Sequence, residues 1–132
     1  MTSTIIRDLK QELQDNMTKL FDDYGVFFAF SKNQFDKQKK DGVKYLDGGA
    51  GMLIPKDISN EFIDKLDKLH SDFDNKISSD KELKNKYILY QLLNYEAFYT
   101  GDYYETFEKL GNGYTLEEVK AVYIQNMDKY QD

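Results

Sequence analysis

The chain has 132 residues, of which 40% are hydrophobic and 15% aromatic, and this is enough apolar material for one compact core. It has no cysteine, which rules out disulfides and cysteine nucleophiles. It has one histidine, His70, which disfavours multi-histidine metal sites. The net charge is −6, with lysines and acids interleaved and Arg7 as the single arginine. Because nucleic-acid binders neutralise phosphates with clustered Lys and Arg, we expect no direct nucleic-acid binding. We also expect no metal and no cofactor.

The first third of the chain is predicted to form two helices separated by a strand. Residues 4–23 place apolar side chains at steps of three and four, which is typical of an amphipathic helix. These side chains are Ile5, Leu9, Leu13, Met17, Leu20 and Phe21. VFFAF at 26–30 is a short apolar run, which favours a strand covered on both faces. Ser31 and Gln34 form a capping box that starts a short helix to about Lys40.

A glycine-rich hairpin and a long helix follow. Residues 43–46 and 52–55 are the predicted arms of the hairpin, and DGGAG at 47–51 connects them. Asp57 is predicted to cap a helix that runs to about Ile77. Its buried stripe comprises Ile58, Phe62, Leu66, Leu69, Phe73 and Ile77.

The segment 83–99 is apolar on nearly all sides, so we expect it to be the central, buried helix. Ser79 and Glu82 are predicted to cap it, and Thr100-Gly101 to end it. A short helix from Asp102 and a last helix with a Thr115–Glu118 capping box complete the chain. The pattern predicts an α+β fold: a single, mostly helical domain over residues 1–132 with a small antiparallel sheet of about three strands.

The order of these parts resembles a small, uncharacterised family of bacterial and phage or mobile-element proteins. The resemblance rests on FFAFS at 27–31, the glycine hairpin with IPKD at 54–57, and NYEAFYTGD at 94–102, and it covers roughly residues 24–124. It implies no reaction, but it implies an accessory protein of a phage or mobile element. No apolar run has the length of a signal peptide or a membrane span, so we expect a cytoplasmic protein of a bacterial host cell.

The hairpin glycines are the first candidate site. Gly48, Gly49 and Gly51 with Lys56 could hold an anion, because backbone amides and a lysine are what phosphate loops use. The phosphate-loop spacing is absent, however, and the glycines join two strands. An ordinary hairpin turn is therefore the stronger interpretation.

The second candidate is the C-terminal part of the central helix. Glu96 is expected among apolar neighbours, where a raised pKa would suit a general acid or base, with Asp102 nearby. A structural role for both carboxylates, including a helix cap at Asp102, is the favoured alternative. Amides and aromatics on the same helix could line a ligand pocket or could equally be core packing. These residues are Tyr87, Gln91, Asn94, Tyr95 and Phe98, and Tyr99 is a further candidate ligand-binding residue.

The surplus of tyrosine points to protein binding, because tyrosine offers contact area at low entropic cost. Tyr103, Tyr104 and Tyr130 are the predicted exposed interface residues, since the helical stripes do not need them. The leading hypothesis is a non-catalytic accessory protein that binds a host or phage protein, with inhibition of a host defence system as one form. The alternative is a small-ligand or nucleotide-binding domain that uses the hairpin and the aromatic face of the central helix. The oligomeric state stays open.

Overall fold

The structure is a computed structural model that describes residues 4–130. Its contacts divide the chain into two compact units: unit 1 holds residues 4–10 and 73–130, and unit 2 holds residues 11–72. The described residues form seven α-helices, one 3-10 turn and one three-stranded antiparallel sheet, which confirms the predicted α+β class. One domain over residues 1–132 stays a prediction, and residues 1–3 and 131–132 lie outside the described part.

Unit 2 contains the sheet, in the order β1-β3-β2. Strands β2 (Tyr45–Asp47) and β3 (Met52–Pro55) form the predicted hairpin, in which Leu46 pairs with Ile54. Strand β1 (Phe27–Phe28) is shorter than predicted and lies at an edge, where Phe28 is exposed. The prediction that this strand is covered on both faces is therefore wrong. The chain leaves the sheet early because the next helix already begins at residue 32.

Helix α2 (Lys32–Gln38) starts at the predicted capping residue. Ser31 Oγ accepts a hydrogen bond from the Gln34 amide (3.2 Å), and Gln34 Oε1 accepts one from the Phe30 amide (2.7 Å). In a standard capping box Gln34 would accept from the amide of the cap residue Ser31, but here it accepts from the amide of Phe30, the residue before it. Either way two amides at the helix start are satisfied, as a capping box requires.

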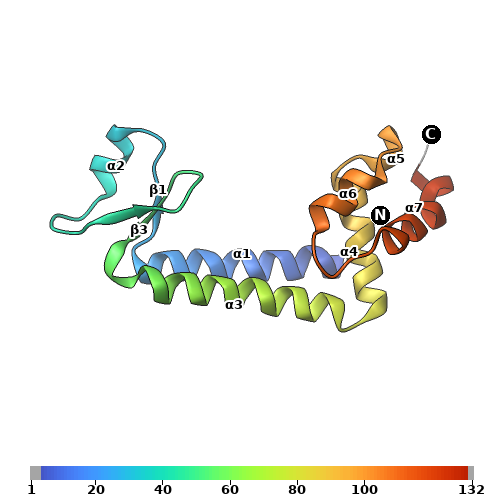
Figure 1. Cartoon of the computed structure of the whole chain (residues 1–132), viewed down its shortest axis with the longest axis horizontal. Helices are drawn as coiled ribbons and strands as arrows, with labels where there is room; N and C mark the ends of the chain where they lie inside the picture. The colour runs from blue at the N-terminus through green and yellow to red at the C-terminus, as the bar shows by residue number, and fades with distance from the viewer. Residues whose placement is uncertain (1–3, 131–132) are drawn as a thin grey trace. The chain divides into compact units, whose positions relative to one another are not determined.

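Parts of two long helices supply the rest of unit 2. They are residues 11–24 of α1 (Thr4–Tyr24) and residues 59–72 of α3 (Ser59–Ser78), which follows the 3-10 turn η1 (Lys56–Ile58). Asp57 lies inside η1, so the predicted cap at Asp57 is wrong. Within unit 2 the two helices lie side by side and run in opposite directions (Figure 1).

The core of unit 2 lies where these helices meet the sheet. It is built on Val26, Ile54 and Phe62. Farther from the sheet, the predicted stripes face the expected way but are only half-buried. The half-buried side chains are Leu13, Met17, Leu20, Leu66 and Leu69. Two helices alone therefore do not enclose their own apolar seam.

Unit 1 is built around α4 (Lys81–Asn94), which contacts α5 (Ala97–Thr100), α6 (Tyr103–Leu110) and α7 (Leu116–Tyr130). Ile88 and Leu92 of α4 are fully buried, together with Val119 of α7. The predicted central helix is therefore confirmed within this unit. At its start, the Asp80 carboxylate accepts hydrogen bonds from two backbone amides, so the predicted cap at Ser79 is wrong by one residue.

The predicted continuation of the central helix to Tyr99 is also wrong. Helix α4 ends at Asn94, and Glu96 has left-handed backbone angles (φ 57°, ψ 33°) before the short helix α5 begins. The break turns the chain so that Ala97 and Phe98 enter the core. No glycine or proline marks this break in the sequence.

The last helix begins with the predicted capping box. Thr115 Oγ1 accepts from the Glu118 amide (3.1 Å), and Glu118 Oε1 accepts from the Thr115 amide (2.9 Å). Lys84 of α4 forms an ion pair with Glu118 (2.9 Å) and lies over the ring of Tyr114 (5.1 Å). The hydrogen bond from Lys84, supported by that from Thr115, lowers the pKa of Glu118.

The burial of α4 predicts a large effect of Ile88→Ala. We expect it to lower the free energy of unfolding by about 2–5 kcal/mol, because it empties a fully enclosed site. Ile124→Ala on α7 is the matched control, because this isoleucine is 54% exposed and its truncation should change the stability by no more than about 0.5 kcal/mol. Urea denaturation measures both. Similar losses in the two variants would show that α4 is not the centre of the unit.

The Glu118 contacts predict a specific pH dependence of stability. A carboxyl whose folded pKa lies below its unfolded value stabilises the fold above that value, about 4.3, and loses this contribution as the pH falls through the folded pKa. Glu118→Gln should therefore flatten the fall in unfolding free energy between about pH 5 and pH 3. Glu117→Gln, at the exposed neighbouring residue, should leave that fall unchanged. Parallel curves for all three proteins would contradict the prediction.

Candidate functional site

The most exposed aromatic side chains of unit 1 lie in residues 95–108, which we call the junction segment. Tyr99 is 91% exposed and Tyr104 is 51% exposed. Tyr99 points outward because its helix neighbours Ala97 and Phe98 are buried, with the Phe98 ring stacked 5.0 Å from that of Tyr123. Two large aromatic side chains are thus held in solvent by a backbone anchored in the core.

Only one of the three tyrosines predicted as an exposed interface is exposed. Tyr104 is, whereas Tyr103 packs on Tyr123 with ring centres 5.1 Å apart. Tyr130 packs on Phe98 with ring centres 5.4 Å apart. The prediction was wrong for Tyr103 and Tyr130 because both lie on the inner side of their helices, against the core.

The junction segment carries acidic side chains without any lysine or arginine. All four are exposed: Glu96, Asp102, Glu105 and Glu108. Asp102 Oδ1 accepts from the Glu105 amide (3.1 Å) and caps α6, which is its favoured structural role. The chain has no Lys or Arg between Lys86 and Lys109, so this segment is a local excess of negative charge.

Glu96 does not lie in the apolar environment that the sequence predicts for it. The prediction placed it among apolar side chains on a continuous helix, but it is exposed and lies between two helices. Water therefore solvates its carboxylate, and the expected desolvation is wrong. What sets Glu96 apart is its backbone: the left-handed region costs a residue with a side chain about 1–2 kcal/mol. Such strain is concentrated at functional segments.

The amides on α4 are engaged with each other and with tyrosine. Gln91 Nε2 donates to the Tyr87 hydroxyl (2.9 Å), and Asn94 Nδ2 donates to Gln91 Oε1 (3.4 Å). Tyr87 packs edge-on against Phe73 at 5.7 Å, and burial raises its pKa. Tyr95, at the end of α4, is half-buried. These contacts favour core packing over a ligand pocket on this face.

The hairpin does not present a cradle of free amides. The Gly48 amide donates to the Met52 carbonyl (2.8 Å), and the Gly49 amide donates to Asp47 Oδ1 (2.8 Å). Lys56 follows β3 at its far end, about 17 Å along the strand from Gly51. The structure therefore does not bring these glycines and Lys56 together.

Gly51 has a packing role. Its φ of +83° lies in the left-handed region, and an added Cβ would clash with the ring of Phe30. The Gly51 carbonyl also accepts from the Ala29 amide (2.9 Å). Glycine is thus required where the hairpin meets the segment after β1.

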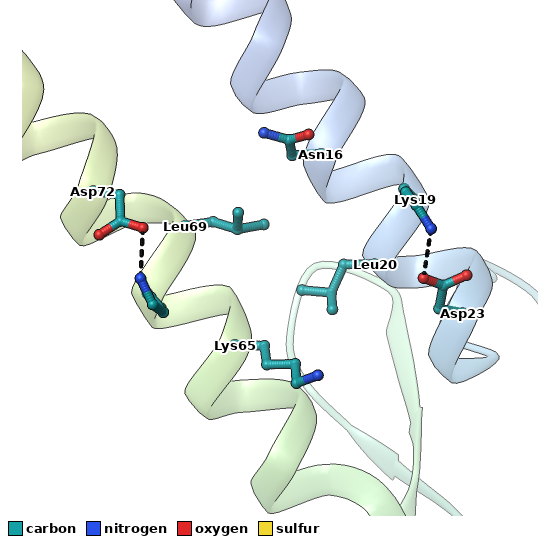
Figure 2. A pocket seen from close by; sticks show the side chains of 8 residues that line it. Asn16, Lys19, Leu20, Asp23, Lys65, Leu69 and Asp72 are labelled. Atoms are coloured by element: carbon teal, nitrogen blue, oxygen red, sulfur yellow. Dashed lines mark hydrogen bonds and ion pairs between the residues drawn. The ribbon is translucent and has the colours of Figure 1, made fainter.

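A groove in unit 2 was missed by the sequence analysis. It lies between α1 and α3 and has a volume of about 430 Å³ (Figure 2). Ion pairs join Lys19 to Asp23 (3.1 Å) and Lys68 to Asp72 (2.9 Å) along its two sides. Eight residues line it: Asn16, Lys19, Leu20, Asp23, Lys65, Lys68, Leu69 and Asp72.

The sequence contains a signal for this groove that periodicity alone did not reveal. Lys-Leu, with Asp three residues after the leucine, occurs on both helices, at 19–23 and at 68–72. The helical period places all three side chains of each set on one face. The repeat indicates a shared surface only when the two helices are known to lie side by side.

Neither a metal site nor a membrane span emerges from the described residues. Residues 4–130 contain no group of three or more His, Cys, Asp or Glu side chains placed to hold a metal ion. Over the same range, none of the helices is both long enough and apolar enough to cross a bilayer.

The strain at Glu96 predicts that Glu96→Gly stabilises the fold. We expect a gain of about 0.5 kcal/mol in unfolding free energy, because glycine removes the left-handed penalty and loses part of the gain to its freer unfolded chain. Glu108→Gly, at an exposed position inside α6, is the control and should cost about 1 kcal/mol. Thermal or urea unfolding would measure both changes. A loss of stability in Glu96→Gly would argue against backbone strain at this residue.

Comparison with known proteins places the chain in a protein family. The chain has no match among curated proteins or solved structures. A family of unknown function (DUF7659) matches residues 9–129, which is nearly the whole chain and contains both the junction segment and the groove. The protein therefore belongs to this family of unknown function.

Proposed function

We propose that the protein is a non-catalytic accessory protein that binds another protein through the junction segment. The exposure of Tyr99 supports this most directly, since a tyrosine that is 91% exposed contributes almost nothing to the core. Tyrosine loses little entropy on binding and offers both apolar area and a hydroxyl, and it is enriched among residues that dominate binding energy. Tyr104, exposed on the next helix, adds a second side chain of the same kind.

The charge of the segment indicates what kind of partner fits. Four carboxylates without a cation attract a basic surface and repel phosphate, which favours a protein over a nucleic acid. Arginine suits this chemistry best, because its guanidinium stacks on aromatic faces and bonds carboxylates with two donors. The proposed partner is therefore a protein with a basic, arginine-bearing segment.

The resemblance to proteins of phages and mobile elements supports the accessory role. In that setting, a host or phage protein in the cytoplasm of a bacterial cell is the expected partner. Inhibition of a host defence system is one consequence of such binding that we propose. No step of this proposal requires a catalytic group.

The alternative, a small-ligand or nucleotide-binding domain, has less support from the geometry. The amides of Gly48 and Gly49 bond within the hairpin, and Gln91 bonds Tyr87. This alternative predicts thermal stabilisation by particular nucleotides or metabolites, because a bound ligand stabilises the folded state by mass action.

Loss of the exposed tyrosines should abolish partner binding. We expect the tagged protein to retain a basic partner from a bacterial lysate in a stoichiometric amount, and the double variant Tyr99→Ser/Tyr104→Ser to lose it. Calorimetry with the purified partner should show about a tenfold or larger loss of affinity for each single variant.

Phe30→Ser is the matched control, because it removes an exposed aromatic side chain from unit 2 and should leave capture unchanged. Equal retention by the double variant, or the lack of any stoichiometric partner of the wild type, would count against the proposal.

A further inference from the structure

The groove of unit 2 carries the same side chains on both of its sides. Lys19, Leu20 and Asp23 line it from α1, and Lys68, Leu69 and Asp72 line it from α3. The repeat differs only three residues before each lysine, where α1 has Asn16 and α3 has Lys65. Three matched positions on each of two different helices make the groove an internally repeated surface.

Because the helices run in opposite directions, the repeat has an approximate two-fold symmetry. Leu20 and Leu69 point toward each other near the middle of the groove (Figure 2). Each lysine immediately precedes its leucine, and each aspartate lies about 6 Å farther along its helix than the lysine. A rotation by half a turn therefore brings the side chains of α1 onto those of α3.

The groove is also a place where apolar surface is not fully covered. Leu13 and Met17 of α1 and Leu66 of α3 are only half-buried, as are the two leucines of the groove. A layer of two helices buries one side of its seam, and four-helix bundles bury the other side with a second pair.

The four charged side chains are available to another molecule. In both ion pairs the lysine and the aspartate are each more than half exposed. Such i,i+4 pairs on a helix surface contribute little stability, so exchanging partners costs little. Lys65, whose Nζ lies 5.4 Å from the ring centre of Tyr24, adds one further cation.

We propose that this groove binds a second copy of the same chain, so that α1 and α3 of the two copies form a four-helix bundle. The matched charges of this surface are Lys19, Lys68, Asp23 and Asp72. These two-fold-related positions are complementary to themselves, because each of the two lysines can face an aspartate of the other copy. The four leucines then close the seam between the two helix pairs. An unrelated protein would not in general carry Lys, Leu and Asp in the same two-fold arrangement, whereas a second copy always does. The second copy is therefore the favoured occupant. The proposal concerns unit 2 and does not depend on binding by the junction segment.

Sedimentation equilibrium of the full chain tests the proposal. We expect the wild type to have twice the monomer mass of 15.6 kDa at about 100 μM, where a dimer of micromolar Kd is mostly formed. Leu69→Asp should give the monomer, because it buries a charge at the centre of the seam. Ile63→Asp on the same helix is the control; Ile63 is 39% exposed and does not line the groove, so the dimer should remain.

Charge exchange provides a second arm that does not alter the leucines. Asp23→Lys/Asp72→Lys and Lys19→Asp/Lys68→Asp should each weaken self-association at least about 100-fold through like-charge repulsion. An equimolar mixture of the two variants should restore a 1:1 dimer. Circular dichroism confirms that each variant is folded.

Three results would overturn the proposal. They are a monomeric wild type, a dimer that survives both charge-exchange variants, and a mixture of those variants that stays monomeric. A dimer formed through another surface would give the second of these results.

Discussion

The burial of α4 is the constraint on which unit 1 depends. Between Tyr87 and Leu93 every side chain of α4 is buried or half-buried, and α5, α6 and α7 supply the cover around Ile88 and Leu92. Polar groups that remain on α4 must then bond locally. Gln91 does so with Tyr87, and Lys84 does so with Glu118 of α7. The same core thus sets where the acidic and aromatic surface of the unit begins.

The break after α4 follows from this packing. A helix continued in a straight line would carry Phe98 away from Tyr123, whereas the left-handed turn at Glu96 lets the two rings stack. The aromatic stacking and the burial of Ala97 offset the backbone strain at one exposed residue. The side chain that faces outward as a result is Tyr99. The turn that buries Phe98 therefore also exposes Tyr99.

Local signals were sufficient to predict most elements. Side-chain caps at Ser31 and Thr115 and the glycine connection of the hairpin act within a few residues, so the sequence contains their complete cause. The break at Glu96 could not be predicted, because neither glycine nor proline is present and the distant ring of Tyr123 decides it. The orientations of Tyr103 and Tyr130 depend on the same distant contacts. The groove was missed because the two Lys-Leu-Asp sets lie 49 residues apart in the sequence. They form one surface only because α1 and α3 lie side by side.

The spacing within each set restricts how the chain can vary in length. One residue inserted within residues 16–23 or 65–72 would rotate the side chains beyond it by about 100° around the helix axis and separate Lys from Leu and Asp. An insertion in the exposed connection at 48–50 would move no helix face, because loops absorb added residues at little entropic cost. Across the family, length changes should therefore accumulate at the hairpin tip and be rare in α1 and α3, where the spacing of Lys, Leu and Asp keeps them on one helix face.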